Sequence, residues 1–247
     1  FLTQTYIDRL RVHKSPPFSH VSRLFHSFLL SLRFSNSFLC VFDDNQNTPI
    51  HFAARKLSLN SARFLLKTKY SNFLLFNRFD ENVIIVALKH ADNKQENANK
   101  LCLEFLELIL QNCIDNNERD LLLNSCDVSG CTPLYWAVKN WDIEIVSFLL
   151  ELGAAVNVFQ EIDINGLPSP KIKQPLHEAV KKGDIEIVKL LLDHGADYIE
   201  RENNKSALQL AEDLGKNEIA QLIWRKIIRD GKAWPYHYDD DEDCVIV

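Results

Sequence analysis

The feature that most constrains the fold of this chain is an internal duplication. Two segments, WAVKNWDIEIVSFLLELGAAVNV from Trp136 and EAVKKGDIEIVKLLLDHGADYIE from Glu178, share the runs A-V-K, D-I-E-I-V, LL and G-A. Their offset exceeds one repeat of about 33 residues because residues 159–173 are rich in polar residues, Pro and Gly, which predicts an enlarged loop. Such self-similarity predicts an array of small helical units that bury their apolar faces against their neighbours.

A helix-start signal precedes each copy and recurs along the chain. Proline is favourable at the first position of a helix, where its missing N–H would lack a partner anyway, and a preceding Thr caps the helix. The signal is found as Thr48-Pro49, Thr132-Pro133 and Gln174-Pro175, in weaker form as Ser206-Ala207, and as a degenerate copy at Asn82-Val83. Five starts predict five repeats.

Within each repeat the pattern predicts a short first helix, a turn and a second helix. Asp142 and Asp184 are predicted N-caps of two second helices. Gly153 and Gly195 are predicted to leave those helices through left-handed residues. Stacking of neighbouring pairs completes a core that no single pair has.

These residues resemble the ankyrin repeat, whose pattern is D-x-x-G-x-T-P-L-H-x-A, then G, I-V-x-L-L-L and G-A-D. The match is closest from Asp127 to Leu134 and from Pro175 to Asp197. The resemblance implies an all-α solenoid of stacked antiparallel helix pairs, with a concave face made by the first helices and finger loops along one edge. In a departure from the pattern, Trp141 stands at a turn glycine, and residues 90–100 are predicted to be an insertion between the helices of the second repeat.

The array is expected to span residues 43–230, between two segments of different character. Approximate repeats cover residues 43–76, 77–114, 127–158, 169–200 and 201–230. In the N-terminal segment, residues 1–42, the stretch 27–39 resembles residues 63–75, so residues 21–32 are predicted to be the second helix of an incomplete capping repeat. Residues 231–247 contain a run of acids and are expected to form a flexible tail.

Composition argues against several classes of partner. The net charge of −6 at pH 7 gives no global positive field that would favour nucleic acid or an anionic membrane. The uncharged apolar stretches near the start are far shorter than the about twenty residues of a membrane span. Six scattered cysteines form no Cys-x-x-Cys and have no His at ligand spacing. We therefore expect reduced thiols, no metal site, and a cytoplasmic or nuclear location.

Catalytic signatures such as G-x-S-x-G, H-E-x-x-H and the P-loop are absent from the sequence, which predicts a protein that is not an enzyme and needs no cofactor. His51 and His177 fall at the family's Thr-Pro-Leu-His position, where the resemblance implies that the imidazole bonds to neighbouring backbone. Trp136 is expected to lie in the core rather than in a binding hot spot. Cys126 and Cys131 are interpreted as small apolar fillers.

The last four residues, Cys244 to Val247, fit the Cys-aliphatic-aliphatic-X form that prenyltransferases recognise. Against lipidation, Val is outside the usual set of final residues, and the five upstream acids stand where a second, basic anchor is normally wanted. Three interpretations stay open. They are lipidation of Cys244 with membrane association, docking of the last three residues in a PDZ-type groove, and neither.

The resemblance implies a non-enzymatic adapter or scaffold that binds another protein on its concave face and finger loops. The alternatives are a regulatory or targeting segment of a larger enzyme and a prenyl-anchored membrane adapter. The family's variable contact positions are the two residues before the turn that ends each first helix. They are Arg55 and Lys56, Lys89 and His90, Lys139 and Asn140, Lys181 and Lys182, then Asp213 and Leu214.

Four successive repeats thus place a cation at the first contact position. In one interpretation these lysines are solvated and stabilise the C-terminal ends of their helices. In the other they form a row of cations for an acidic segment of a partner protein, and the chain's own residues 239–243 compete for it.

Overall fold

The computed structural model describes residues 42–67, 73–91, 93–94, 97–158, 172–199, 202 and 205–231. Secondary structure in these ranges is helical apart from one isolated bridge between Glu202 and Lys205, which confirms the all-α prediction. The predictions for residues 1–41, for the tail from residue 232 and for Cys244 fall outside the described residues. Among the described residues, no helix is both long and apolar enough to cross a membrane.

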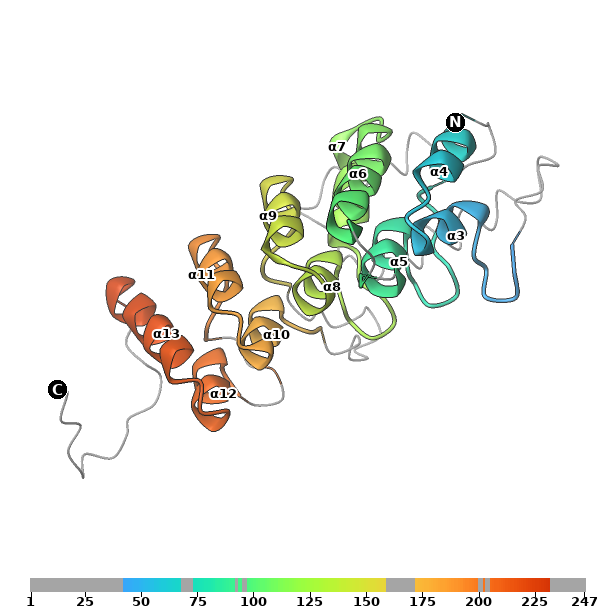
Figure 1. The fold of residues 1–247 in the computed structure, drawn as a ribbon. Helices are drawn as coiled ribbons and strands as arrows, with labels where there is room; N and C mark the ends of the chain where they lie inside the picture. Colours follow the sequence, from blue (N-terminus) through green and yellow to red (C-terminus); the bar gives the residue numbers. More distant parts are fainter. Residues whose placement is uncertain are drawn as a thin grey trace, which may run out of the picture.

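The described helices form five consecutive pairs and one additional helix (Figure 1). The first helices of the pairs are α3 (Pro49–Arg55), α5 (Val83–His90), α8 (Pro133–Asn140), α10 (Pro175–Lys182) and α12 (Ala207–Asp213). The second helices are α4 (Leu59–Leu66), α6 (Ala98–Gln111), α9 (Ile143–Glu151), α11 (Ile185–Asp193) and α13 (Asn217–Arg229). Each first helix contacts its own partner, and the pairs stack so that first helices form one row and second helices another.

Local side-chain chemistry explains where the helices begin and end. The side chains of Asn82, Thr132 and Ser206 each accept a hydrogen bond from the backbone N–H three residues further on. Asp142 and Asp184 cap α9 and α11, as predicted. Gly153 and Gly195 follow these two helices with φ values of 91° and 83°, which confirms the predicted left-handed exits.

The additional helix, α7 (Asn116–Asn124), was not predicted. It begins at Asp115, whose side chain accepts the N–H of Glu118, and it packs against α5 and α8. Its apolar residues are the consecutive Leu121, Leu122 and Leu123, so the sequence lacks the spacing that indicates an amphipathic helix. The predicted insertion at residues 90–100 was also too long, because α5 includes His90 and α6 already begins at Ala98.

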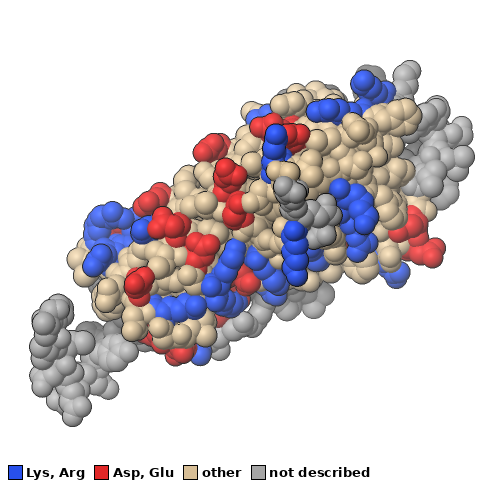
Figure 2. All heavy atoms as spheres, viewed as in Figure 1, with Lys and Arg blue, Asp and Glu red and all other residues tan. Residues whose placement is uncertain are grey.

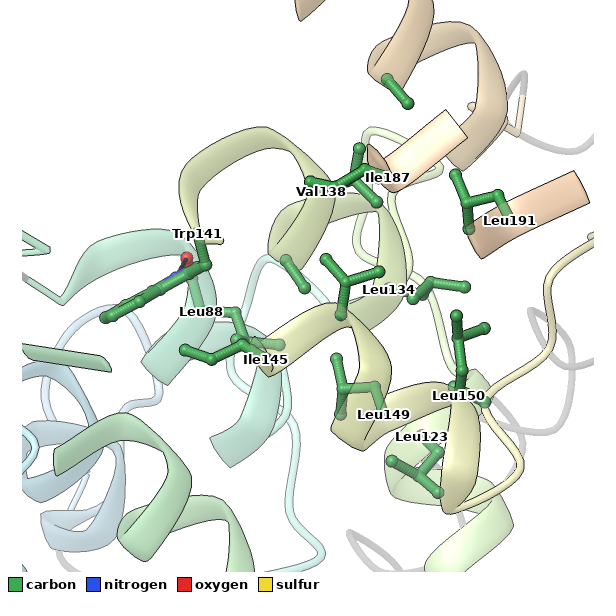
Figure 3. Close-up of a cluster of buried hydrophobic side chains, with 14 of the residues drawn as sticks. Leu88, Leu123, Leu134, Val138, Trp141, Ile145, Leu149, Leu150, Ile187 and Leu191 are labelled. Atoms are coloured by element: carbon green, nitrogen blue, oxygen red, sulfur yellow. Dashed lines mark hydrogen bonds between the residues drawn. The ribbon is translucent and has the colours of Figure 1, made fainter. Parts of the chain in front are cut away.

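One apolar cluster runs through all five pairs, from Ile50 to Ile227. Figure 3 shows its middle part, where side chains of α7, α8, α9 and α11 interdigitate. Trp141, at the place of the family's turn glycine, is 3% exposed, and its indole N–H donates to the carbonyl of Leu88 at 2.8 Å. Its φ of −122° is ordinary extended backbone, whereas the equivalent Gly183 is left-handed at 81°. The third pair therefore turns without a left-handed residue and uses the indole to contact the second pair.

Candidate functional site

The predicted contact positions lie at the C-terminal ends of the first helices, which share one row (Figure 1). Figure 2 shows Lys and Arg side chains gathered along this row, with acidic side chains among them. Arg55 and Lys56 are exposed at the end of α3, and neither makes an ion pair with a described residue. The remaining positions differ in what their side chains contact.

Lys89 is held between two carboxylates that come from different loops. Its Nζ lies 2.7 Å from Glu81 Oε1 and 2.9 Å from Asp127 Oδ2. The side chains of Glu81 and Asp127 are 4% and 0% exposed. His90 also reaches Glu81, with Nε2 3.0 Å from Oε1. The cation at this position is therefore paired within the molecule and holds two loops to α5.

The pKa values of this cluster fit that arrangement. Burial alone would raise the pKa of Glu81, but hydrogen bonds from His90, Lys89 and Asn77 outweigh it and hold the pKa at about 2. Burial would likewise lower the pKa of Lys89, and its hydrogen bonds to Glu81 and Asp127 raise it instead. Glu81 and Lys89 are therefore both charged at neutral pH.

Asp127 also organises its own finger loop. Its Oδ1 accepts the N–H groups of Ser129 and Cys131 at 2.9 and 3.1 Å, and its Oδ2 accepts the indole N–H of Trp136 at 3.1 Å. Asn77 closes the preceding loop in the same way, by accepting the N–H groups two and four residues further on. A repeated Asp or Asn at the loop start is the sequence signal that predicts this turn.

Lys139 has different surroundings from Lys89. It is exposed, and its Nζ lies 4.9 Å from the ring centre of Trp136 and 5.9 Å from that of Tyr135. Lys173 approaches the Tyr135 ring from the loop before α10, at 5.8 Å, and Lys89 lies 4.8 Å from the Trp136 ring. Cations at these distances are attracted by the aromatic face. We call Lys89, Tyr135, Trp136, Lys139 and Lys173 the lysine–aromatic patch.

The expectation that Trp136 belongs to the core is met in part, because the side chain lies at the edge of the core. Its side chain is half-buried and packs against the core on one side, while two lysines border its ring. Its indole N–H donates to the buried carboxylate of Asp127, so the polar edge of the ring has a partner inside the molecule. Tyr135 is buried, and its hydroxyl donates to Glu178 at 2.8 Å.

Three of the predicted contact residues join neighbouring pairs. Lys181 Nζ lies 2.6 Å from Glu202 Oε1 and 3.8 Å from Glu178 Oε2. Lys182 Nζ donates to the carbonyls of Trp141 and Val138, at 2.8 and 3.2 Å. The Asn140 amide donates to the carbonyl of Leu88 at 3.0 Å. Each of these three side chains therefore bonds within the molecule, either to a neighbouring helix pair or to the loop that follows its own helix pair.

In the last pair, the two predicted contact positions are not occupied by cations. Asp213 accepts from Lys205 at 2.5 Å, and Leu214 is 47% exposed. Among the described cations at the predicted contact positions, Arg55, Lys56, Lys139 and Lys182 have no carboxylate at ion-pair distance, and Lys182 is bonded instead to the carbonyls of Trp141 and Val138. Their role in binding stays a prediction. Tyr135 and Lys173 were not predicted, although the aromatic residues three and four positions before Lys139 signal contact on one helix face.

The two histidines have the structural roles that the resemblance implied. His51 Nδ1 accepts the N–H of Thr48 at 3.1 Å, and its Nε2 lies 3.3 Å from the carbonyl of Glu81. His177 Nε2 lies 2.9 Å from the carbonyl of Lys205. Each imidazole thus links its first helix to the loop that precedes the next one.

The described cysteines form no disulfide, and Cys102, Cys126 and Cys131 are buried. Burial raises the pKa of Cys131 to about 12 and that of Cys113 to about 11, so neither is a reactive thiolate at neutral pH. The described ranges contain no group of three or more side chains suited to hold a metal ion.

Comparison with known protein families found two matches. Residues 129–159, which contain α8 and α9, match the model described as "Ankyrin repeat". Residues 158–229, which contain α10 to α13, match the model described as "Ankyrin repeats (3 copies)". No curated protein matches the chain with significant similarity.

Proposed function

Because the chain is an ankyrin repeat protein, with its repeats matched over residues 129–229, we propose that it is a non-enzymatic adapter or scaffold. These repeats indicate a module for protein–protein interaction. The partner protein binds along the row of first helices, and its main contact is the lysine–aromatic patch. We also propose a cytoplasmic location, with membrane association only where Cys244 is lipidated.

One observation supports this placement above the others: Lys139 is exposed, lies over two aromatic rings, and has no carboxylate partner in the described residues. Lys89 and Lys181, at the same place in neighbouring repeats, are paired with the chain's own acids. A half-buried Trp beside a cation that has no internal ion-pair partner is typical of the centre of a binding surface.

The chemistry of the patch favours an acidic segment of the partner. Carboxylates of such a segment pair with Lys139 and Lys173, and its aliphatic carbons cover the exposed part of the Trp136 ring. The net charge of −6 on the whole chain repels an acidic partner at long range. The attraction therefore comes from ion pairs formed at the patch itself, and we expect binding to weaken as salt is added.

The test compares the full-length protein with two charge-reversal variants. Lys139→Glu reverses the charge at the patch, and Lys189→Glu is the matched control, because Lys189 is exposed on α11 in the other row and pairs only with Glu186 within the described residues. Each immobilised protein is used to capture partners from a cell extract, and the bound proteins are quantified by mass spectrometry at low and moderate salt. We expect Lys139→Glu to reduce the capture of specific partners about tenfold and Lys189→Glu to leave it unchanged.

Circular dichroism and melting temperature should be the same for all three proteins, since both lysines are exposed. Equal capture by the parent and Lys139→Glu would exclude the patch as the contact surface. Capture that depends on Lys139 but not on salt would retain the surface and reject the acidic partner.

A further inference from the structure

An open apolar groove lies at the beginning of the described array, away from the lysine–aromatic patch. It has a volume of about 770 Å³ and is lined mainly by side chains of α3 and α4. Its aromatic residues are Phe52 and Phe64, which are 50% and 70% exposed. Large apolar side chains that are exposed together typically mark a surface that is covered by something else.

Comparison with the other pairs shows that Phe64 is unusually exposed. It is the sixth residue after the capping residue of its second helix. The residues at the same position in α9, α11 and α13 are Phe148, Leu190 and Leu222. All three are half-buried and pack against the core.

Phe52 departs from its counterparts in the same way. It is the fourth residue after the cap of its first helix. The residues at this position in the later first helices are Val86, Trp136, Glu178 and Leu210, each of them buried or half-buried. In the described residues α3 and α4 contact a further pair on one side only, which explains why the groove is open.

The sequence that precedes α3 contains a segment suited to this groove. Apolar residues in residues 21–32 recur at the three- and four-residue spacing of one helix face. They are Val21, Leu24, Phe25, Phe28, Leu29 and Leu32. The positions between them are mostly polar, as at Arg23, Ser27 and Ser31.

Two further relations favour this segment over any other occupant. The similarity of residues 27–39 to residues 63–75 aligns Phe28 with Phe64. The connection between this segment and α3, residues 33–48, has the same length as the connection between α4 and α5, residues 67–82. A connection of this length therefore suffices to bring one second helix beside the next.

We propose that residues 21–32 of this chain occupy the groove, with their apolar face on Phe52 and Phe64. The segment stacks on α4 as α4 stacks on α6, and it closes the apolar core at this end of the array. While it is seated, the groove is not open to a partner protein. This inference is independent of the binding proposed for the lysine–aromatic patch.

Hydrogen–deuterium exchange of the full-length protein tests the contact from both sides. Phe28→Glu places a charge on the apolar face of the segment, and Ser27→Glu places the same charge on the neighbouring polar position. We expect Phe28→Glu to speed the exchange of amides in α4 about tenfold, while Ser27→Glu leaves it unchanged.

The reciprocal variant is Phe64→Glu. The side chain of Phe64 is 70% exposed, so this variant should fold normally. It should speed the exchange of residues 21–32 about tenfold, whereas Arg63→Glu, exposed beside it, should not. The proposal is overturned if neither aromatic variant changes exchange in the opposite segment. It is also overturned if light scattering shows a dimer that Phe64→Glu dissociates and Phe28→Glu does not, because the occupant is then a second copy.

Discussion

At the scale of single residues, the buried imidazole of His51 is restricted to one protonation state by its neighbours. Nδ1 accepts the Thr48 N–H, so it has no proton, and Nε2 supplies the proton toward the Glu81 carbonyl. If Nδ1 were also protonated, its N–H would face the N–H of Thr48, and the hydrogen bond between them would be lost. Burial accordingly lowers the pKa of His51 from 6.5 to about 4.

This shift predicts a loss of stability in mild acid. The unfolded chain binds a proton at His51 near pH 6.5 and the folded chain only near pH 4. The free energy of unfolding should therefore decrease as the pH falls from about 6.5 to 4, by up to about 3 kcal/mol from this residue. Urea denaturation across this pH range measures the effect. In His51→Gln the slope should be markedly smaller, and an unchanged slope would assign the loss to other groups.

Whether a residue's role was predictable depended on how far away its partners lie in the sequence. The caps Thr132, Asp142 and Asp184 bond to backbone only two or three residues away, so composition at the helix start sufficed. Lys89 pairs with Asp127, which lies 38 residues further on. A local sequence pattern cannot pair two residues that are so far apart in the chain. The sequence therefore predicted only that Lys89 is solvated or binds a partner.

At the scale of the helix, the turn between α8 and α9 is built around an indole instead of a glycine. Restoring the family's residue with Trp141→Gly should therefore destabilise the protein, by about 3 to 5 kcal/mol. The variant removes a buried aromatic side chain and gains nothing from glycine, because the backbone at this position is extended. Chemical denaturation followed by circular dichroism measures the change.

Trp141→Phe is the graded control for this prediction. It keeps most of the ring and loses the 2.8 Å hydrogen bond to Leu88, whose carbonyl still accepts from Asn140. A cost of about 1 kcal/mol is expected. If both variants were as stable as the parent, the indole would not be needed to join the second and third pairs.

Helix α7 could not be predicted from the spacing of apolar residues in the sequence. The five first helices could be predicted because each carries a start signal followed by apolar residues at helical spacing. α7 instead has exposed polar residues and a run of three leucines, of which Leu122 and Leu123 are buried against the array. Its helical state depends on that tertiary contact, which the sequence does not display.

At the scale of the whole molecule, each pair contacts only its neighbours, so stability is distributed along the stack. α8 and α10 are flanked on both sides, whereas α12 and α13 have a described neighbour on one side only. We expect amides of α12 and α13 to exchange with deuterium about tenfold faster than those of α8 and α10. Peptide-level mass spectrometry resolves these segments, and equal rates would mean that the array opens as a single cooperative unit.

The hydrogen bonds that meet at the carbonyl of Leu88 have a consequence for how such a protein is assembled from repeats. The junction between the fourth and fifth pairs uses a histidine and a short loop, as the repeat pattern prescribes. The junction between the second and third pairs depends on Asn140 and Trp141 reaching back to one carbonyl, with α7 packed beside it. The second and third pairs are therefore not interchangeable modules, because placing either of them beside a different neighbour would remove these contacts.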